Sequence, residues 1–323
     1  MTTLLLGGLG LGLSLLVPEV LARARWTARA PGPSVVLWQA VTLASVLSAV
    51  GVVLVAPEEL VRALDTGPDV EAWVLVGALA VAGLIVARLV WSTAGVLLRS
   101  QRRRARHADL VDLLGRAETG ALQHPGGAPL RVLDGPLPLA YCLPGRAPRV
   151  VLSGAALQAL TAEQVQAVLT HEQAHLRARH DLVLESFTAV YQAVPRPLRS
   201  RVPLESVSLL LEMVADDAAR ARCGPAPLAS ALCAMSTDGD LSTHNLSTHD
   251  LGPAGRAARR HDRTPQDDRR RRVGRLQRPA TAEGSLRASV LALAVAVLVL
   301  PTAFVVAPWL AQALASLPPL PGW

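Results

Sequence analysis

Four long apolar runs constrain this chain more than any other feature of its sequence. They cover residues 4–22, 35–55, 73–98 and 288–310. An α-helix needs about 20 predominantly apolar residues to cross roughly 30 Å of hydrocarbon, so each run is long enough to span a bilayer. The composition agrees, since hydrophobic residues make up 51% of the chain and charged residues only 18%. We therefore expect a multi-pass membrane protein whose surroundings include the lipid bilayer.

Two of these runs carry a feature that needs explanation. No Lys or Arg precedes the first run, so it lacks the basic segment that opens a signal peptide, and we expect a retained span. Arg88 interrupts the third run 11 residues before Arg99. Because long arginine side chains near a helix end can reach the polar interface, we expect Arg88 to reach it. A buried, functional Arg88 is the alternative.

The charges of the connecting segments predict how the spans are oriented. The first loop and the segment after the third span are rich in arginine, whereas the second loop is acidic. The arginines concerned are Arg23, Arg25, Arg29, Arg99, Arg102, Arg103, Arg104 and Arg106. Short loops rich in Lys and Arg stay on the cytoplasmic side. We therefore expect both termini to be extracytoplasmic and residues 100–287 to be cytoplasmic.

The net charge of +7 does not indicate a nucleic-acid-binding protein. Eleven arginines between residues 256 and 287 face four acidic residues, and this surplus alone equals the charge of the whole chain. The cluster directly precedes the fourth apolar run, where arginines fix topology and attract anionic lipid headgroups. We expect no nucleic-acid partner.

The three cysteines are widely spaced, without a CxxC pair, and predict free thiols.

The polar segment between the third and fourth spans divides into a folded part and a linker. Residues 100–235 predict a small α+β domain with a short helix at 108–117, strands at 130–133, 139–142 and 149–152, and helices ending near 179 and covering 204–222. Thr161 and Gln164 have the spacing of a capping box at the start of the first longer helix. Residues 236–287 predict a disordered, Arg-rich linker. Residues 311–323 predict a short extracytoplasmic tail.

The stretch His171-Glu-Gln-Ala-His175 has the HExxH form of a zinc hydrolase. Residues four apart share a helical face, so His171 and His175 can bind one ion through their ring nitrogens. Glu172 lies about 100° further around the helix, where it can reach a water on the metal without binding the metal. Val168 and Leu169 place the motif on a helix with a buried face. We expect one Zn²⁺ per chain, with Glu172 as the catalytic acid and base.

A catalytic zinc has three protein ligands and one open position, so a third ligand is needed. We exclude His180, which follows His175 by five residues, because the metzincin motif needs six residues and a glycine. Glu212 is the better candidate, on the second longer helix and 37 residues after His175. Asp216 lies one turn further on the same face, where it can accept an N–H from a ligand histidine. The competing carboxylates on this helix are Glu205 and Asp217.

The order of these features resembles the BlaR/MecR membrane metallopeptidases, family fifty-six in the usual peptidase numbering. The resemblance rests on three spans before the motif, one span after it, and the stretches RVVLSGAALQALTAEQVQAVLTHEQAHLRARHD (149–181) and EMVAD (212–216). It implies a mainly α membrane protein with four transmembrane helices and a cytosolic α+β gluzincin-like zinc peptidase domain between spans three and four. The implied roles are zinc ligation by His171, His175 and Glu212, acid–base catalysis by Glu172, and support of a ligand by Asp216.

The resemblance also implies a location and a function. It predicts the plasma membrane of a bacterium, a substrate backbone paired with the strand at 149–152, and cleavage of a cytosolic regulatory protein, such as a transcriptional repressor, in signal transduction. The β-lactam sensors of that family carry an external penicillin-binding domain after the last span. Here some 13 residues follow residue 310, so we do not expect antibiotic sensing.

Two alternative functions stay open at this point. The first is a protease of the HtpX/CAAX-prenyl type that acts in membrane-protein quality control, which three spans before the motif disfavour. The second is a signalling protein that binds zinc without catalysis. A structural zinc site would need four protein ligands, usually with cysteine, and no cysteine lies near HEQAH in the sequence. A homodimer is also left open.

Overall fold

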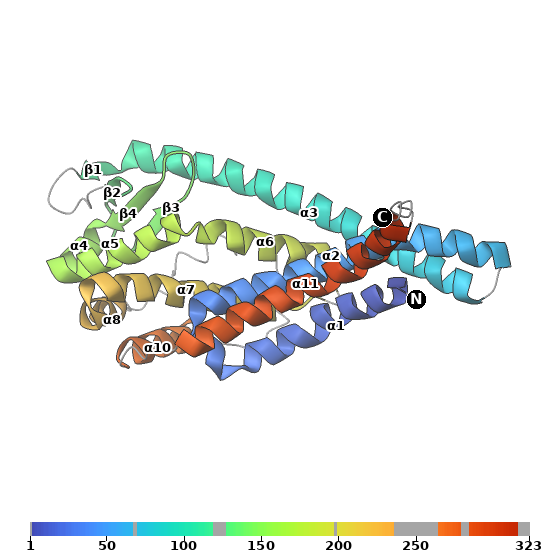
Figure 1. Cartoon of the computed structure of the whole chain (residues 1–323). Coiled ribbons are helices and arrows are strands. Elements are labelled where there is room, and N and C mark those ends of the chain that lie inside the picture. Colours follow the sequence, from blue (N-terminus) through green and yellow to red (C-terminus); the bar gives the residue numbers. More distant parts are fainter. Residues whose placement is uncertain are drawn as a thin grey trace, which may run out of the picture. The chain divides into compact units, whose positions relative to one another are not determined.

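The computed structural model describes residues 2–66, 70–118, 127–196, 199–235, 264–278 and 284–315 (Figure 1). The chain forms two compact units. The first comprises Met1–Gly95, Ser186–Leu210 and Glu283–Trp323, and the second comprises Val96–Glu185 and Leu211–Ala282. Helices α3 (Val70–Leu114), α6 (His180–Ala193) and α7 (Val202–Cys223) contribute residues to both units.

Long apolar helices make up most of the first unit. They are α1 (Thr2–Arg23), α2 (Pro31–Thr66), the first part of α3, and α11 (Gly284–Ala315), with a short 3-10 helix η1 (Arg25–Ala28) between α1 and α2. Four segments are long and apolar enough to cross a membrane, among the residues that the structure describes: Thr2–Arg23, Pro31–Leu64, Ala72–Leu114 and Gly284–Val305. Each of the four apolar runs predicted as a span therefore lies in a helix of sufficient length.

Helix α2 packs against both α1 and α11, and Gly51 lies at a tight contact with both. A Cβ atom at Gly51 would lie 2.8 Å from Cγ2 of Val305 and 3.0 Å from Cδ1 of Leu6. Small residues allow membrane helices to pack closely where water gives no hydrophobic driving force. A larger side chain at this position would push the helices apart.

Arg88 of α3 forms a hydrogen bond that the sequence did not predict. Its Nε donates to the carbonyl of Ala193, in the last turn of α6, at 2.7 Å. The hydroxyl of Ser92, one turn later on α3, donates to the carbonyl of Ala189 at 2.7 Å. Because the last carbonyls of a helix lack intrahelical donors and carry partial negative charge, they suit a guanidinium. Arg88 thus has a partner within the protein.

A four-stranded sheet lies in the second unit. Its strands are β1 (Arg116–Glu118), β2 (Leu130–Leu133), β3 (Ala140–Leu143) and β4 (Arg149–Ser153), in the order β1-β2-β4-β3. β2 and β4 run parallel, and the other two pairs are antiparallel. The three predicted strands agree with β2, β3 and β4 to within one residue at each end. β1 was not predicted, because its three residues carry no apolar alternation.

The sheet corrects two predictions. The separate helix predicted at 108–117 is the end of α3, which runs unbroken to Leu114. The helix stops at Gly115, whose amide donates to the Val111 carbonyl at 2.8 Å and where a Cβ would lie 2.5 Å from that oxygen. The strand at 149–152 was expected to pair with a substrate, but β4 is bonded to β2 on one edge and to β3 on the other. The edge strand beside β4 is β3.

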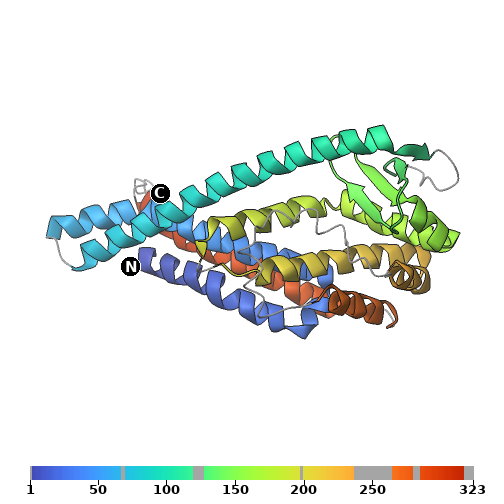
Figure 2. The same ribbon diagram turned by 180° about the vertical axis from the view of Figure 1, so that it is seen from behind.

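The two faces of the sheet are covered by different helices (Figure 2). Val150 and Leu152 belong to a buried cluster with Leu169 of α5 (Ala162–Arg177) and Leu228 of α8 (Pro225–Ala234), whereas Val151 packs with Val111 of α3. Successive residues of a strand point to opposite faces, so one strand serves both clusters. The short helix α4 (Gly154–Ala159) connects β4 to α5. This packing fixes α5, which carries the HExxH motif, against the sheet.

Helix α10 (Pro265–Leu276) corrects the prediction of a disordered linker over 236–287. Thr264 and Asp267 cap its first turn reciprocally, at 3.2 and 3.3 Å, and Pro265 occupies the position where a helix tolerates proline best. Leu276 is buried in the same core cluster as α5 and α8. Residues 284–287 belong to α11. The remaining parts of the predicted linker, 236–263 and 279–283, lie outside the described residues.

Candidate metal centre

Helix α5 begins as the sequence predicts. Oγ1 of Thr161 accepts the amide of Gln164 at 3.3 Å, and the Gln164 side chain accepts the amide of Thr161 at 2.9 Å. Val168 and Leu169 are buried against the sheet and α8. The same helix turns the two histidines of the motif toward α7, where His171 is 6% exposed. A capped, core-packed helix therefore holds the motif.

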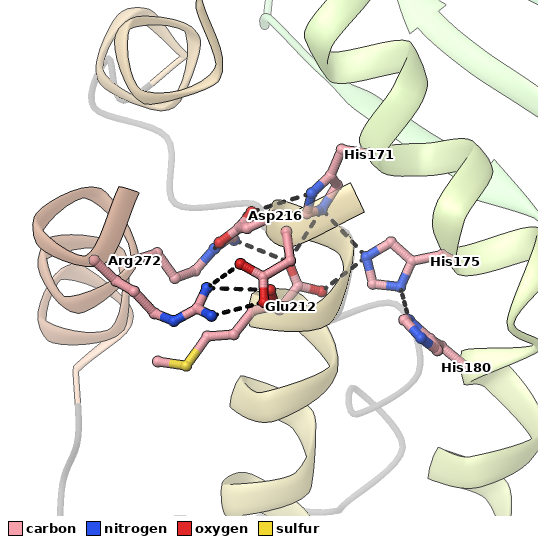
Figure 3. A network of polar contacts seen from close by, with 9 residues as sticks. His171, His175, His180, Glu212, Asp216 and Arg272 are labelled. Carbon is pink, nitrogen blue, oxygen red and sulfur yellow. Dashed lines mark hydrogen bonds and ion pairs between the residues drawn. The ribbon is translucent and has the colours of Figure 1, made fainter. Parts of the chain in front are cut away.

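Three side chains from α5 and α7 converge on one point (Figure 3). Nε2 of His171 lies 3.2 Å from Nε2 of His175 and 3.4 Å from Oε2 of Glu212. Oε1 of Glu212 lies 3.3 Å from Nε2 of His175. The structure thus brings together His171, His175 and Glu212, whose positions in the sequence span more than 40 residues.

The donor atoms of this cluster suit zinc. The three ligand atoms lie within 4.8 Å of one another, and both imidazoles offer the same nitrogen, Nε2. Zn²⁺ binds histidine nitrogen and carboxylate oxygen, and catalytic zinc sites use three protein ligands of these kinds. Within the part of the chain that the structure describes, the converging group contains no cysteine. Cys223, at the end of α7, lies against Thr170 with Sγ 3.7 Å from Oγ1.

Arg272 of α10 binds both carboxylates of α7. Its Nε and Nη2 contact the two oxygens of Asp216 at 2.8 and 2.7 Å, and its Nη1 lies 2.8 Å from Oε2 of Glu212. Asp216 is only 1% exposed, so its charge depends on this partner. Burial alone would raise the pKa of Glu212, but the charge of Arg272, followed by that of His175, holds it well below its usual range. The pKa of Asp216 is lowered against burial by the charge of Arg272 and its hydrogen bonds.

His171 lies between these carboxylates. Its Nδ1 is 3.1 Å from Oδ1 of Asp216, although the ring N–H is not aligned for a regular hydrogen bond. Burial by itself would lower the pKa of His171, but Asp216 and Glu212 raise it to about 10. The surroundings therefore favour a positive charge at the His171 ring. A cation bound at Nε2 would compensate the negative charges of Asp216 and Glu212, as a proton on the ring does.

Glu172 is partly buried beside this cluster. Burial raises the pKa of Glu172, whereas the positive charge of His171 lowers it. The negative charge of Glu212 acts in the same direction as burial. The thiol of Cys142, on β3, lies in hydrogen-bonding contact with the Glu172 carboxylate. Burial raises the pKa of that thiol, so Cys142 is a neutral neighbour. A carboxylate with a raised pKa can take up a proton and release it again near neutral pH.

The other candidates from the sequence have different positions. Asp217 forms a two-pronged ion pair with Arg275, with both N···O distances 2.7 Å, and Glu205 lies two turns before Glu212 on α7. Neither belongs to the converging group found among the described residues. His180, excluded as a ligand by its spacing, lies with its Nδ1 2.8 Å from Nδ1 of His175, on the other nitrogen from the one that faces Glu212.

Sequence reasoning missed two partners of the site. Arg272 was placed in the disordered linker, yet a signal was present in Thr264-Pro-Gln-Asp267, a capping box with proline in the first turn, followed by Val273 and Leu276 three residues apart. His180 was weighed only as a ligand. Its contact with the far side of the His175 ring depends on α6 starting directly after α5, and α6 was not predicted.

Comparison with known proteins gives one family. The sequence model of peptidase family M48 matches residues 117–196, about a quarter of the chain. The matched region includes the sheet apart from Arg116, and the whole of α4, α5 and α6. It contains His171, Glu172 and His175 but ends before Glu212. No significant match was found among curated proteins or among solved structures.

This match supports a metallopeptidase and, together with the four apolar helices, a membrane-associated metalloprotease. Peptidases of family M48 depend on zinc, which agrees with the donor set of the cluster. The match does not confirm the resemblance to the BlaR/MecR family. The match is as consistent with an HtpX-type protease as with a protease that cleaves a regulatory protein.

Proposed function

We propose that this protein is a membrane-embedded, zinc-dependent endopeptidase. The observation that carries the proposal is the convergence of His171 and His175 from α5 with Glu212 from α7, with Glu172 one residue along α5 from the first histidine. This arrangement provides three ligands of the types zinc prefers and a neighbouring carboxylate that is not needed as a ligand.

His171, His175 and Glu212 would hold the zinc ion. Bound zinc would lower the pKa of a coordinated water to about 7 and polarise the scissile carbonyl. Glu172 would accept the proton of the attacking water and return it to the leaving amine, a task that its raised pKa suits. Asp216, fixed by Arg272, would keep the His171 ring in place from its Nδ1 side.

We propose that the substrate backbone pairs with the edge of β3. An extended peptide can add a strand to an exposed sheet edge through main-chain hydrogen bonds. β3 is the edge strand on this side of the sheet, it packs against α5, and its Cys142 contacts Glu172. A peptide added to β3 would therefore run past the carboxylate that handles the proton.

Two substrate classes remain candidates. The resemblance of the sequence favours a cytosolic regulatory protein, such as a transcriptional repressor, whose cleavage transmits a signal. The match to family M48 is equally consistent with a membrane protein cleaved in quality control, as in the HtpX/CAAX-prenyl type. Cleavage of soluble β-casein compared with a single-span reporter protein, each in proteoliposomes with the full-length protein, separates the two.

We further propose that the peptidase segment faces the cytosol of a bacterium and that both termini are extracytoplasmic. The arginines of the first loop and of residues 99–106 support this orientation. Alkaline phosphatase fused to the C-terminus should then be active, and green fluorescent protein at the same place should be dark. The opposite pattern would reverse the orientation.

The decisive test uses the full-length protein purified in detergent. Wild-type protein should contain about one zinc ion per chain and cleave quenched fluorescent peptides. Glu172→Gln should keep its zinc while kcat falls by a factor on the order of 10² to 10⁴, and His171→Ala should lose both zinc and cleavage. Cleavage by Glu172→Gln at the wild-type rate would contradict the catalytic role of Glu172. Wild-type protein that holds zinc but cleaves no peptide would contradict an enzymatic role, and it would leave the zinc-binding signalling protein as the explanation.

A further inference from the structure

We propose that His180 is a positioning residue that fixes the ring of the zinc ligand His175, and that Arg104 on α3 holds His180 in place. This inference rests on the proposed function. It concerns the Nδ1 side of the His175 ring, which faces away from His171 and Glu212.

His175 is held at both of its ring nitrogens. Nε2 faces the metal cluster, 3.2 Å from His171 and 3.3 Å from Glu212, while Nδ1 lies 2.8 Å from Nδ1 of His180. The two rings are nearly perpendicular, at 89°, with their centroids 4.7 Å apart. His180 is 4% exposed, so this contact is shielded from water. The geometry matches the support that ligand histidines commonly receive on their second nitrogen.

The distance between the two Nδ1 atoms decides where the protons are. At 2.8 Å one nitrogen must donate and the other accept, so a single proton lies between them. A histidine that binds zinc through Nε2 is neutral and carries its proton on Nδ1. His175 is therefore the donor, and His180 accepts at Nδ1 and carries its own proton on Nε2. His180 thus selects the tautomer of His175 that leaves Nε2 available to a metal.

The turn between α5 and α6 brings His180 to this position. Two residues separate the helices, and the second, Arg179, has a φ of 49°. Residues other than glycine rarely adopt this left-handed conformation, and such strain persists only where the surrounding structure holds it. The strained turn lets α6 start at His180, directly beside the ring of His175.

The first two turns of α6 are joined to α3 by ion pairs. Arg104 binds Asp181 at 3.0 Å and Glu185 at closer range, and Ser100 donates to the same Glu185 carboxylate. The Asp181 and Glu185 side chains are only 19% and 13% exposed. Charges this far from water are costly to separate from their partners. Because Asp181 is the residue next to His180, Arg104 fixes the place of the His180 backbone.

The contacts of Arg104 with Asp181 and Glu185 also connect the His180–His175 pair to a candidate span. Arg104 lies on α3, and the same unbroken helix carries the third segment that is apolar enough to cross a membrane. A rotation or shift of this helix at residue 104 would move Asp181, and with it His180. The path from helix to ligand consists of two polar contacts, Arg104 to Asp181 and His180 to His175.

The test compares His180→Leu with His180→Asn in the full-length protein. The two side chains are similar in size, but only asparagine keeps an oxygen that can accept the Nδ1–H of His175. Zinc affinity is measured by competition with a chromophoric chelator, and kcat and KM on the peptide that the wild-type protein cleaves. We expect His180→Leu to bind zinc about 10- to 100-fold more weakly and to lower kcat with KM unchanged, and His180→Asn to recover most of the affinity.

Two further variants test the role of Arg104. Arg104→Gln should weaken zinc binding in the same direction as His180→Leu, by a smaller factor. Arg106→Gln is the matched control, because Arg106 lies exposed on the same helix and donates to the Arg102 carbonyl one turn away. This variant should leave zinc affinity unchanged. The thermal unfolding temperature of each variant is recorded with the affinity, since a merely structural role would lower that temperature without changing zinc affinity.

Each outcome decides the proposal. Wild-type protein that binds zinc and cleaves peptide, beside a His180→Leu variant of equal zinc affinity, would overturn the role of His180 alone. Loss of affinity that asparagine does not recover would overturn the proton-acceptor argument, and an unchanged Arg104→Gln would overturn the link to α3. Wild-type protein without zinc would instead overturn the proposed function.

Discussion

Helices α5 and α10 both bring side chains to the carboxylates of α7, but different forces hold them in place. Figure 3 shows His171 and His175 on one side of the Glu212 carboxylate and Arg272 on another. α5 is held by apolar residues that pack against the sheet and α8. α10 carries four consecutive arginines, 269–272, directly after Asp267 and Asp268, and it contributes Val273 and Leu276 to the core.

The difference lies in what each helix depends on. The apolar contacts of α5 are spread over several turns, so no single one fixes its position. α10 is joined to α7 by two arginines, Arg272 to Asp216 and Glu212, and Arg275 to Asp217. A buried charge that loses its partner costs far more than an exposed one. We infer that α10 is the more easily displaced of the two, and that its displacement affects the cluster of His171, His175 and Glu212 through Arg272.

Replacing Arg272 should give the largest effect on this comparison. Arg272→Leu leaves Glu212 and Asp216 without their cation, and we expect a loss of about 3–5 kcal/mol in unfolding free energy. Added zinc should recover part of this loss, since a divalent cation bound at Glu212 also compensates buried negative charge. Thermal unfolding of the full-length protein in detergent, with zinc and with a chelator, measures both effects.

Arg275→Leu is the control for Arg272→Leu. Asp217, its partner, is 34% exposed, and a solvent-accessible ion pair contributes about 0–1 kcal/mol. Equal losses in the two variants would show that the arginines act only by attaching α10, and that the contact of Arg272 with Glu212 adds nothing to stability beyond this attachment.

The core residues of the two helices provide the next test. Leu169 of α5 and Leu276 of α10 are 2% and 1% exposed and belong to one buried cluster. Leu169→Ala should cost about 2–5 kcal/mol, because a helix packed on several sides cannot close the cavity. Leu276→Ala should lie near the lower end, about 2 kcal/mol, because Leu276 is the last residue of α10 and that end can relax. A larger loss at Leu276 would mean that apolar burial, and not Arg272, holds α10.

The sequence predicted the parts of the molecule whose signals are local. The four apolar runs, strands β2 to β4, and the helix start at Thr161 each have a pattern readable within a few residues. The pairing of Glu212 with the histidines was also predictable, because a third ligand is required and Glu212 and Asp216 share a face one turn apart.

The remaining contacts depend on partners far away in the sequence. Arg272 is recognised by its pairing with Asp216, 56 residues earlier, and nothing near Arg272 distinguishes it from the neighbouring arginines. The place of β4 between β2 and β3 follows from strand order, which residue patterns leave open. Arg88 likewise finds the end of α6 some 105 residues later. Tertiary packing determines each of these contacts, so they could not be predicted from local sequence patterns.

The smallest expected effects test whether the two helices differ at all in their local stability. Thr161 and Thr264 form the same reciprocal cap, with Gln164 and Asp267 respectively. Replacing a threonine cap by alanine costs about 1 kcal/mol through the backbone N–H groups left without an acceptor. If the helices differ only in how they are attached, Thr161→Ala and Thr264→Ala should lower the unfolding free energy by similar amounts.

Hydrogen exchange should nevertheless distinguish the two variants, because a weakened α10 can unfold by itself while a weakened α5 remains packed on the sheet. Faster exchange confined to residues 265–276 in Thr264→Ala, without a matching change over 162–177 in Thr161→Ala, is the expected result. Equal exchange in both helices would mean that the buried ion pairs of α10 hold it as firmly as apolar packing holds α5.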